Sequence, residues 1–139
     1  MKLGVMRSEK MQNIYINKEC VFCNLDNRKI ITQTENAFAI RDKYPVTAGH
    51  TLIIPKVHES NFFLLTQEIQ FELLELLHIC QKALDKEFNP DGYNVGININ
   101  EMAGQTVNHV HIHLIPRYKG DVDRPQGGVR GVIPSKKEY

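Results

Sequence analysis

The apolar residues of this chain recur with two different spacings. One is typical of an amphipathic helix, and the other is typical of β-strands. Residues 67–88 carry apolar side chains at helical spacing, with acidic and basic side chains opposite, which predicts one long amphipathic helix. Thr66 is a suitable N-cap, and Asn-Pro-Asp-Gly at 89–92 is a strong stop. Residues 59–66 predict a further short helical turn with Ser60 as its cap.

Four other segments have the apolar runs or the strict alternation of β-strands. They are residues 35–42, 50–55, 92–100 and 107–116. Pro55 cannot donate to a sheet and marks the end of its strand. In the last segment Val110, Ile112 and Leu114 are expected to face the core, while the histidines between them point outward. The pattern predicts an α+β domain with an antiparallel sheet.

The composition narrows the class of protein. The chain has 139 residues, of which 42% are apolar and 24% charged, as in a globular protein with one core. The net charge is only +1 and the basic residues are scattered, which argues against nucleic acid or an anionic membrane as a partner. There is neither an apolar run of the roughly 20 residues that a spanning helix needs nor a secretory signal. We therefore expect a cytoplasmic protein.

We expect three regions along the chain. Residues 1–13 are expected to form a flexible N-terminal extension, 14–118 the folded domain, and 119–139 a Gly- and Pro-rich C-terminal tail. The tail contains Gly127, Gly128 and Gly131 together with Arg124 and Arg130. Such a segment can fold over phosphates, cross to a partner subunit, or lie in solvent.

Three histidines stand at alternate positions of the last strand segment. On a strand, His109 and His113 would lie about 13 Å apart, whereas a zinc–nitrogen bond is about 2.1 Å, so the three cannot share one ion. The central His111 suits a nucleophile, because a neutral imidazole attacks phosphorus when its other nitrogen is held by a hydrogen bond. Gln105 and Thr106 at the preceding turn can donate to the phosphoryl group, as can His113. Surface histidines without a role are the alternative.

Three blocks of this sequence resemble the histidine-triad (HIT) family. They are AIRDKYPVTAGHTLIIPKVH, GYNVGIN and AGQTVNHVHIHLIPR, the last of which holds the motif His-x-His-x-His. The resemblance extends from about Cys20 to Arg117. It implies a five-stranded antiparallel sheet with one long and one short helix, and a homodimer. It also implies an enzyme acting on the α-phosphate of nucleotide conjugates, such as dinucleoside polyphosphates or nucleoside phosphoramidates.

The resemblance assigns roles to the matching positions. His111 matches the nucleophile that forms a covalent nucleotidyl-histidine, and His113 and Gln105 match residues that contact the phosphate during catalysis. Asp42 matches the carboxylate that binds the ribose hydroxyls. The matching nucleotide-binding positions are Asp42, Asn98, Gln105, Thr106, His111 and His113. Phe38 and Ile40 can line a base pocket, although plain core positions are the simpler interpretation.

The motif Cys-x-x-Cys at Cys20 and Cys23 can be a redox pair, half of a zinc site, or chance. A structural zinc needs four ligands, and His58 and His109 are candidates for the other two. One branch of the resembled family uses this Cys₂His₂ set, and all four positions match. We therefore expect a structural zinc and no metal at the reacting phosphate. The remaining candidates are expected to have structural roles only: Cys80 in the core, His50 in packing or a structural hydrogen bond, and His78 at a surface or part-buried position of the helix.

The sequence thus predicts a nucleotide hydrolase working through a nucleotidyl-histidine. A nucleotidyl transferase with an acceptor other than water is one alternative. A nucleotide-binding regulatory protein with weak catalysis is another, and a zinc-binding interaction module is a third.

Overall fold

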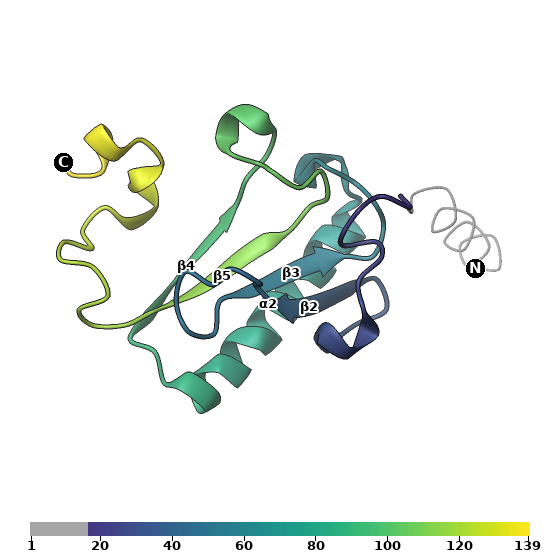
Figure 1. Cartoon of the computed structure of the whole chain (residues 1–139), viewed down its shortest axis with the longest axis horizontal. Coiled ribbons are helices and arrows are strands. Elements are labelled where there is room, and N and C mark those ends of the chain that lie inside the picture. Colours follow the sequence, from purple (N-terminus) through teal and green to yellow (C-terminus); the bar gives the residue numbers. More distant parts are fainter. Residues whose placement is uncertain (1–16) are drawn as a thin grey trace.

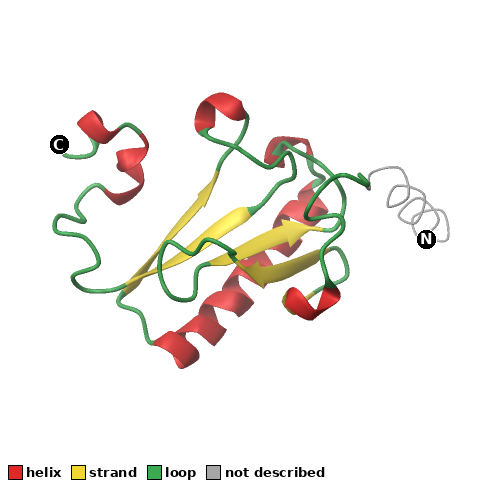
Figure 2. Cartoon of the chain, in the orientation of Figure 1, coloured by secondary structure: helices red, strands yellow, loops and turns green. Residues whose placement is uncertain are grey.

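The computed structural model describes residues 17–139, so the extension expected at 1–13 lies outside the described residues. A five-stranded antiparallel sheet forms the centre, in the order β1-β2-β3-β5-β4. Its strands are β1 (Ile30–Gln33), β2 (Ala37–Arg41), β3 (Thr51–Pro55), β4 (Gly92–Ile97) and β5 (Ile112–Arg117). One long helix, α2 (Gln67–Phe88), crosses one face of the sheet (Figures 1 and 2). The predicted α+β class and antiparallel sheet are confirmed.

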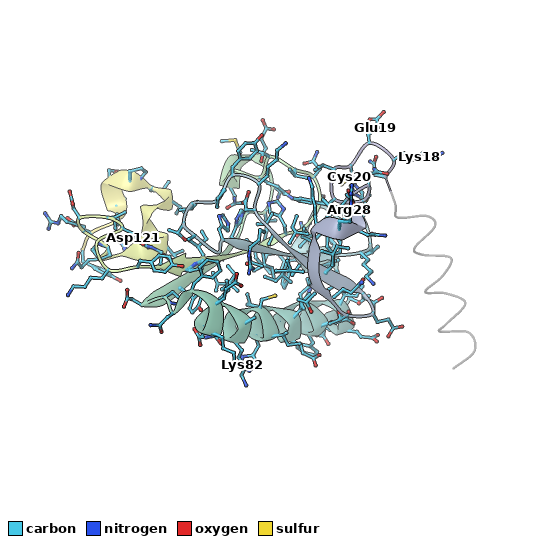
Figure 3. All side chains as sticks on the ribbon, turned by 60° about the horizontal axis from the view of Figure 1, so that its bottom comes forward. Lys18, Glu19, Cys20, Arg28, Lys82 and Asp121 are labelled. Carbon is cyan, nitrogen blue, oxygen red and sulfur yellow. The ribbon has the colours of Figure 1, made fainter. Side chains whose placement is uncertain are left out.

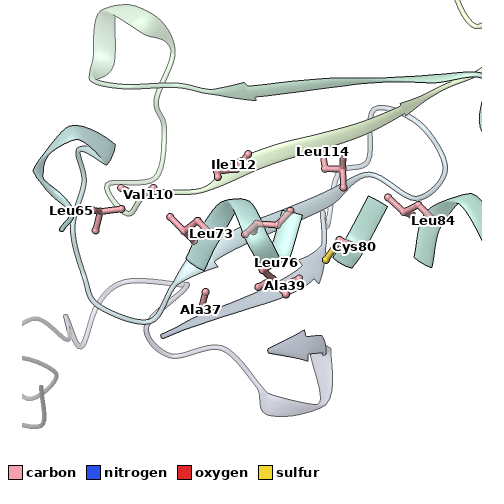
Figure 4. Packing of buried hydrophobic residues seen from close by; sticks show 11 residues of the cluster. Ala37, Ala39, Leu65, Leu73, Leu76, Cys80, Leu84, Val110, Ile112 and Leu114 are labelled. Carbon is pink, nitrogen blue, oxygen red and sulfur yellow. The ribbon is translucent and has the colours of Figure 1, made fainter. Parts of the chain in front are cut away.

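Helix α2 begins and ends at the predicted residues. The Thr66 hydroxyl accepts a hydrogen bond from the Ile69 N–H at 3.2 Å, and Asn89 ends the helix with a left-handed φ of 47°. Its apolar side fills the space against the sheet (Figure 4). The helix residues buried there are Leu73, Leu76, Cys80 and Leu84. Cys80 is a core residue as expected, and burial raises the pKa of its thiol to about 11.

The opposite face of the sheet is also covered, which the strand patterns did not predict. A second core cluster on this face contains Phe22, Phe38, Ile40, Leu52 and Ile54. Phe22 comes from the turn between the two cysteines, which folds back over the sheet together with the following 3₁₀ turn η1 (Asn27–Lys29). The histidine row points away from the α2 side of the sheet as predicted, since Val110, Ile112 and Leu114 pack in the core on that side. Its own face is covered rather than open, and His109 is 0% exposed.

Two strand boundaries differ from the prediction by three residues or more. β4 ends at Ile97 instead of residue 100, and β5 begins at Ile112 instead of residue 107. Residues 98–111 leave the ladder because Asn100 and Gly104 adopt left-handed φ values of 73° and 97° around the 3₁₀ turn η3 (Glu101–Ala103). The chain is then held by the segment after β3, since the Val110 N–H donates to the Glu59 carbonyl at 2.7 Å.

The short helical turn predicted at 59–66 is present as the 3₁₀ turn η2 (Phe62–Leu64). Its cap is Asn61 and not Ser60, because the Asn61 side chain reaches the Phe63 N–H at 2.9 Å. Strand β1, which the residue pattern did not single out, is only four residues long and pairs with β2 alone.

The C-terminal tail folds back beside β4. It contains two 3₁₀ turns, η4 (Gly128–Val132) and η5 (Pro134–Lys136), at the end of the molecule opposite Cys20 (Figures 1 and 3). Arg117 fixes its start, donating to Asp121 at 2.7 Å and to the Asn94 side-chain oxygen at 2.6 Å. Over residues 17–139, the helices are all too short or too polar to cross a membrane.

Candidate functional site

A cavity of about 830 Å³ lies on the histidine face of the sheet. One wall is apolar and is formed by Val21, Phe22, Leu25, Ile40, Leu52 and Val107. The polar lining includes Asp42, His50, Asn98, Thr106, His111 and His113. The tail closes a third side with Gly128, Val129, Gly131 and Val132. Five of the six predicted nucleotide-binding residues therefore share one cavity.

His111 is held in one orientation and one tautomer. Its Nδ1–H donates to the main-chain carbonyl of His109 at 2.8 Å, so the lone pair of a neutral ring is on Nε2. The ring is 8% exposed and lies edge-on to Phe22, with ring centroids 5.2 Å apart. This is the arrangement that a nucleophilic imidazole needs.

His113 lies next to His111 and contacts His50, to which the sequence interpretation gave only a structural role in packing or hydrogen bonding. The ring centroids of His111 and His113 are 5.0 Å apart, and His113 Nδ1 is 3.0 Å from His50 Nε2. Burial, reinforced by the neighbouring His111 and His50, lowers the pKa of His113 to about 4. His113 is therefore neutral at pH 7.

His50 is the site residue that sequence reasoning missed. It is 2% exposed, lines the cavity, and lies 3.4 Å from the Asp42 carboxylate through Nε2. Burial lowers the pKa of His50, although Asp42 acts in the opposite direction. The sequence position of His50 could have indicated this place, because His50 stands directly before β3 and Leu52 of β3 pairs with His113 of β5.

Gln105 stands apart from the other predicted residues. Its side chain is buried, and its oxygen accepts from the Asn100 N–H at 2.8 Å. Its nitrogen donates to the carbonyls of Ser60 at 2.9 Å and Val107 at 3.1 Å. The amide thus braces the loop before the histidine row, whereas Thr106 and Asn98 line the cavity itself.

Cys20, Cys23, His58 and His109 meet in one cluster whose ligand atoms all lie within 4.8 Å of one another. The Cys20 sulfur is 3.3 Å from His109 Nδ1, the Cys23 sulfur is 3.4 Å from His58 Nδ1, and the two Nδ1 atoms are 3.2 Å apart. A tetrahedral zinc with bonds of about 2.1–2.3 Å places its ligand atoms about 3.4–3.8 Å from one another. The four residues therefore fit a zinc ion with small adjustments.

The ring nitrogen of His109 that faces away from the cysteines, Nε2, also supports a zinc site. Its Nε2–H donates to the Pro55 carbonyl at 2.7 Å, which leaves the Nδ1 lone pair directed at the thiols. Burial lowers the pKa of His109 to about 4, and His58 and His111 act in the same direction. The ring is thus neutral at pH 7, as a metal ligand must be.

The fold and the site together define the histidine-triad class: an antiparallel sheet that carries His-x-His-x-His beside a cavity. Residues 25–120 match the HIT domain model, and the chain belongs to the HIT family.

Relatives support this membership in sequence and in structure. Adenosine 5'-monophosphoramidase hnt1 of Schizosaccharomyces pombe is 34% identical, over 70% of this chain and 74% of that protein. A HIT family protein from Bacillus anthracis is 41% identical with a TM-score of 0.70, over 75% of this chain and 77% of that chain. A Zn-bound histidine triad family protein from Mycobacterium smegmatis is 34% identical with a TM-score of 0.68, over 74% of this chain and 78% of that chain.

Proposed function

We propose that this protein hydrolyses nucleotide conjugates at the α-phosphate through a covalent nucleotidyl-His111. The observation that carries the proposal is the hydrogen bond from His111 Nδ1 to the His109 carbonyl, which prepares Nε2 for attack inside a cavity large enough for a nucleotide. The phosphoramidase name of the Schizosaccharomyces pombe relative supports the reaction class.

The reaction has two displacements at the same phosphorus. In the first, a bond forms between His111 Nε2 and the α-phosphorus, the bond to the leaving group breaks, and the leaving group takes a proton from solvent. In the second, water attacks the phosphorus, the nitrogen–phosphorus bond breaks and returns its electron pair to Nε2, a proton of the water passes to solvent, and a nucleoside monophosphate is released. His113 stabilises the charge on the phosphoryl oxygens by donating a hydrogen bond.

We propose a position in the cavity for each part of the nucleotide. Asp42 is proposed to accept hydrogen bonds from the two ribose hydroxyls, with the base against the apolar wall that includes Phe22. Asn98 and Thr106 are proposed to contact the phosphate. For Gln105 we propose action mainly through the loop that it braces, since direct contact with phosphate requires its amide to leave three hydrogen bonds.

Cys20, Cys23, His58 and His109 are proposed to hold a structural zinc ion. When bound, zinc supplies a rigid cross-link and takes no part at the reacting phosphate. The pair of reduced thiols is consistent with a cytoplasmic protein, which is the location we propose.

A homodimer joined along β4 is the proposed assembly. In the part of the chain that the structure describes, β4 is an edge strand whose Val95 is 44% exposed, and Leu74 of α2 is 50% exposed. Unpaired edges and exposed apolar side chains are what a partner strand and helix would cover.

The function is tested with His111→Asn on adenosine 5'-phosphoramidate and a dinucleoside polyphosphate. We expect hydrolysis to fall by about 10³-fold or more, because no other group replaces the nucleophile. His78→Asn is the matched control, since His78 is exposed on α2 far from the cavity lining, and it should retain full activity. Full activity of His111→Asn would contradict the mechanism. Products formed with excess phosphate as acceptor distinguish hydrolysis from transfer.

A further inference from the structure

His50 and His113 form a pair of buried histidines whose protons are ordered by the backbone. The two rings approach with centroids 5.2 Å apart, and His50 Nε2 lies 3.0 Å from His113 Nδ1. A contact between two ring nitrogens at this distance needs one proton between them. Either ring can supply that proton, and the two choices leave His113 with opposite properties toward a phosphate.

The other nitrogen of His50 decides which choice is made. The Val46 main-chain N–H lies 3.0 Å from His50 Nδ1 and points at it. A backbone N–H can only donate, so His50 Nδ1 must carry a lone pair. Burial keeps the ring neutral, and a neutral ring with an unprotonated Nδ1 carries its proton on Nε2.

The proton on His50 Nε2 then fixes the state of His113. Nε2–H donates to His113 Nδ1, with the Asp42 carboxylate as a longer second acceptor at 3.4 Å. His113 Nδ1 is therefore an acceptor, and the proton of a neutral His113 is on Nε2. A phosphoryl oxygen has no proton to give, so only this tautomer lets His113 donate to it.

We propose that His50 is a positioning residue: through the hydrogen bonds Val46 N–H to His50 and His50 to His113, it holds His113 as an Nε2–H donor toward the phosphoryl group. This rests on the proposed function for the role of His113, while the tautomer assignment itself does not. Without His50, the His113 ring is free to place its proton on either nitrogen, and the Nδ1–H form presents a lone pair to an anionic oxygen.

The same three residues, Asp42, His50 and His113, also satisfy the distances of a metal site. The hydrogen bonds argue against that use. The lone pair of His50 is on Nδ1 and is taken by Val46, whereas Nε2, which faces the other two residues, is protonated. His109 shows the opposite pattern. Its Nε2–H donates to the Pro55 carbonyl, and its Nδ1 faces the thiols with a lone pair.

The tautomers are read directly from ¹⁵N long-range correlation spectra of the zinc-loaded, nucleotide-free protein at pH 7.5, with assignment by His50→Gln and His113→Asn. We expect an unprotonated Nδ1 and a protonated Nε2 in both His50 and His113. In His50→Leu, His113 should shift toward a mixture of tautomers. A protonated Nδ1 in wild-type His113 would overturn the assignment and would leave the proposed function standing.

Kinetics separate this role from simple packing. His50→Leu fills the space without a donor, while His50→Gln restores an N–H donor near the position of Nε2. We expect kcat to fall by about 10–100-fold in His50→Leu with a small change in KM, and most of it to return in His50→Gln. Equal losses in the two variants, or no loss in His50→Leu, would overturn the proposal; melting temperatures confirm that both variants are folded.

Discussion

The main-chain carbonyl of His109 lies 2.8 Å from Nδ1 of His111, so one peptide group joins the candidate metal cluster to the candidate nucleophile. The side chain of His109 faces Cys20 and Cys23, while its carbonyl fixes the tautomer of the residue two positions later. A displacement of His109 therefore changes the orientation of His111 without altering the His111 side chain itself. The roles proposed for His109, His111 and His113 are metal binding, attack on phosphorus and hydrogen-bond donation, respectively.

Replacing one thiol of the cluster should remove the metal. In Cys23→Ser we expect loss of stoichiometric zinc and a lower melting temperature, because three ligands bind zinc far more weakly than four and the turn over the sheet loses its cross-link. Metal analysis of the purified protein measures this. Cys80→Ala is the control, since this third cysteine is on the buried side of α2, in the core, and its replacement should leave the zinc content unchanged. Full zinc in Cys23→Ser would contradict the site.

Phe22 stands between the two cysteines of the candidate metal cluster and also lines the apolar wall against which the base is proposed to bind. Phe22→Ala should weaken AMP binding by about 10-fold and ribose 5-phosphate binding much less, since burial of a phenyl ring contributes about 1.5–3 kcal/mol. Calorimetric titration with both ligands measures the difference, after metal analysis has shown that zinc is retained. Phe71→Ala, on the exposed side of α2, is the control. Equal weakening of both ligands would place the base elsewhere.

Glu72 joins helix α2 to the turn between β1 and β2. Its carboxylate accepts from the Thr34 hydroxyl at 2.6 Å and from the Asn36 side-chain amide at 3.0 Å. Burial acts to raise the pKa of Glu72, but these hydrogen bonds outweigh it and the pKa is lowered. Glu72→Gln should therefore reduce the free energy of unfolding by about 1–2 kcal/mol in urea titration. Glu75→Gln, three residues further along the same helix and exposed, should change the free energy of unfolding by less than about 0.5 kcal/mol.

Acid should destabilise the protein partly through His113. Its pKa is lowered to about 4 in the folded state, chiefly by burial, from an unfolded value near 6.5. Between these two pH values the unfolded chain binds more protons than the folded one. The contribution of His113 to the free energy of unfolding is therefore fully present above about pH 6.5 and is lost as the pH falls toward 4. Between pH 7 and pH 5, the free energy of unfolding of His113→Gln should fall by about 1–2 kcal/mol less than that of the wild type. Parallel stability curves for the two proteins would contradict the burial of a neutral His113.

The helix and the core strands could be predicted from sequence because their signals are local. The caps of α2, Thr66 and Asn89, act on neighbouring residues, and the apolar stripe repeats along the helix itself. Pro55 ends β3 because proline has no backbone N–H to donate to the sheet. The covering of the second sheet face could not be predicted in this way. The turn that carries Phe22 has no hydrophobic period, and its position depends on contacts with residues far along the chain.

The site shows the same division between local and distant information. Alternation placed His111 and His113 on one face, and motif resemblance indicated the residues that line the cavity. His50 was missed because its role depends on a contact with a residue 63 positions later and on a backbone donor at Val46. The internal hydrogen bonds of Gln105 depend likewise on the left-handed bend at Asn100, which a β-strand pattern through residue 100 concealed.

His111 is proposed to become covalently attached to the nucleotide during turnover. Rapid acid-free quenching of wild-type protein mixed with adenosine 5'-phosphoramidate, followed by intact mass and peptide mapping, tests it most directly. We predict one added adenylyl group on the peptide containing His111, formed within the first turnover and absent in His111→Asn. An unmodified protein throughout turnover, trapped under conditions that preserve phosphohistidine, or an adduct that persists in His111→Asn would contradict the account.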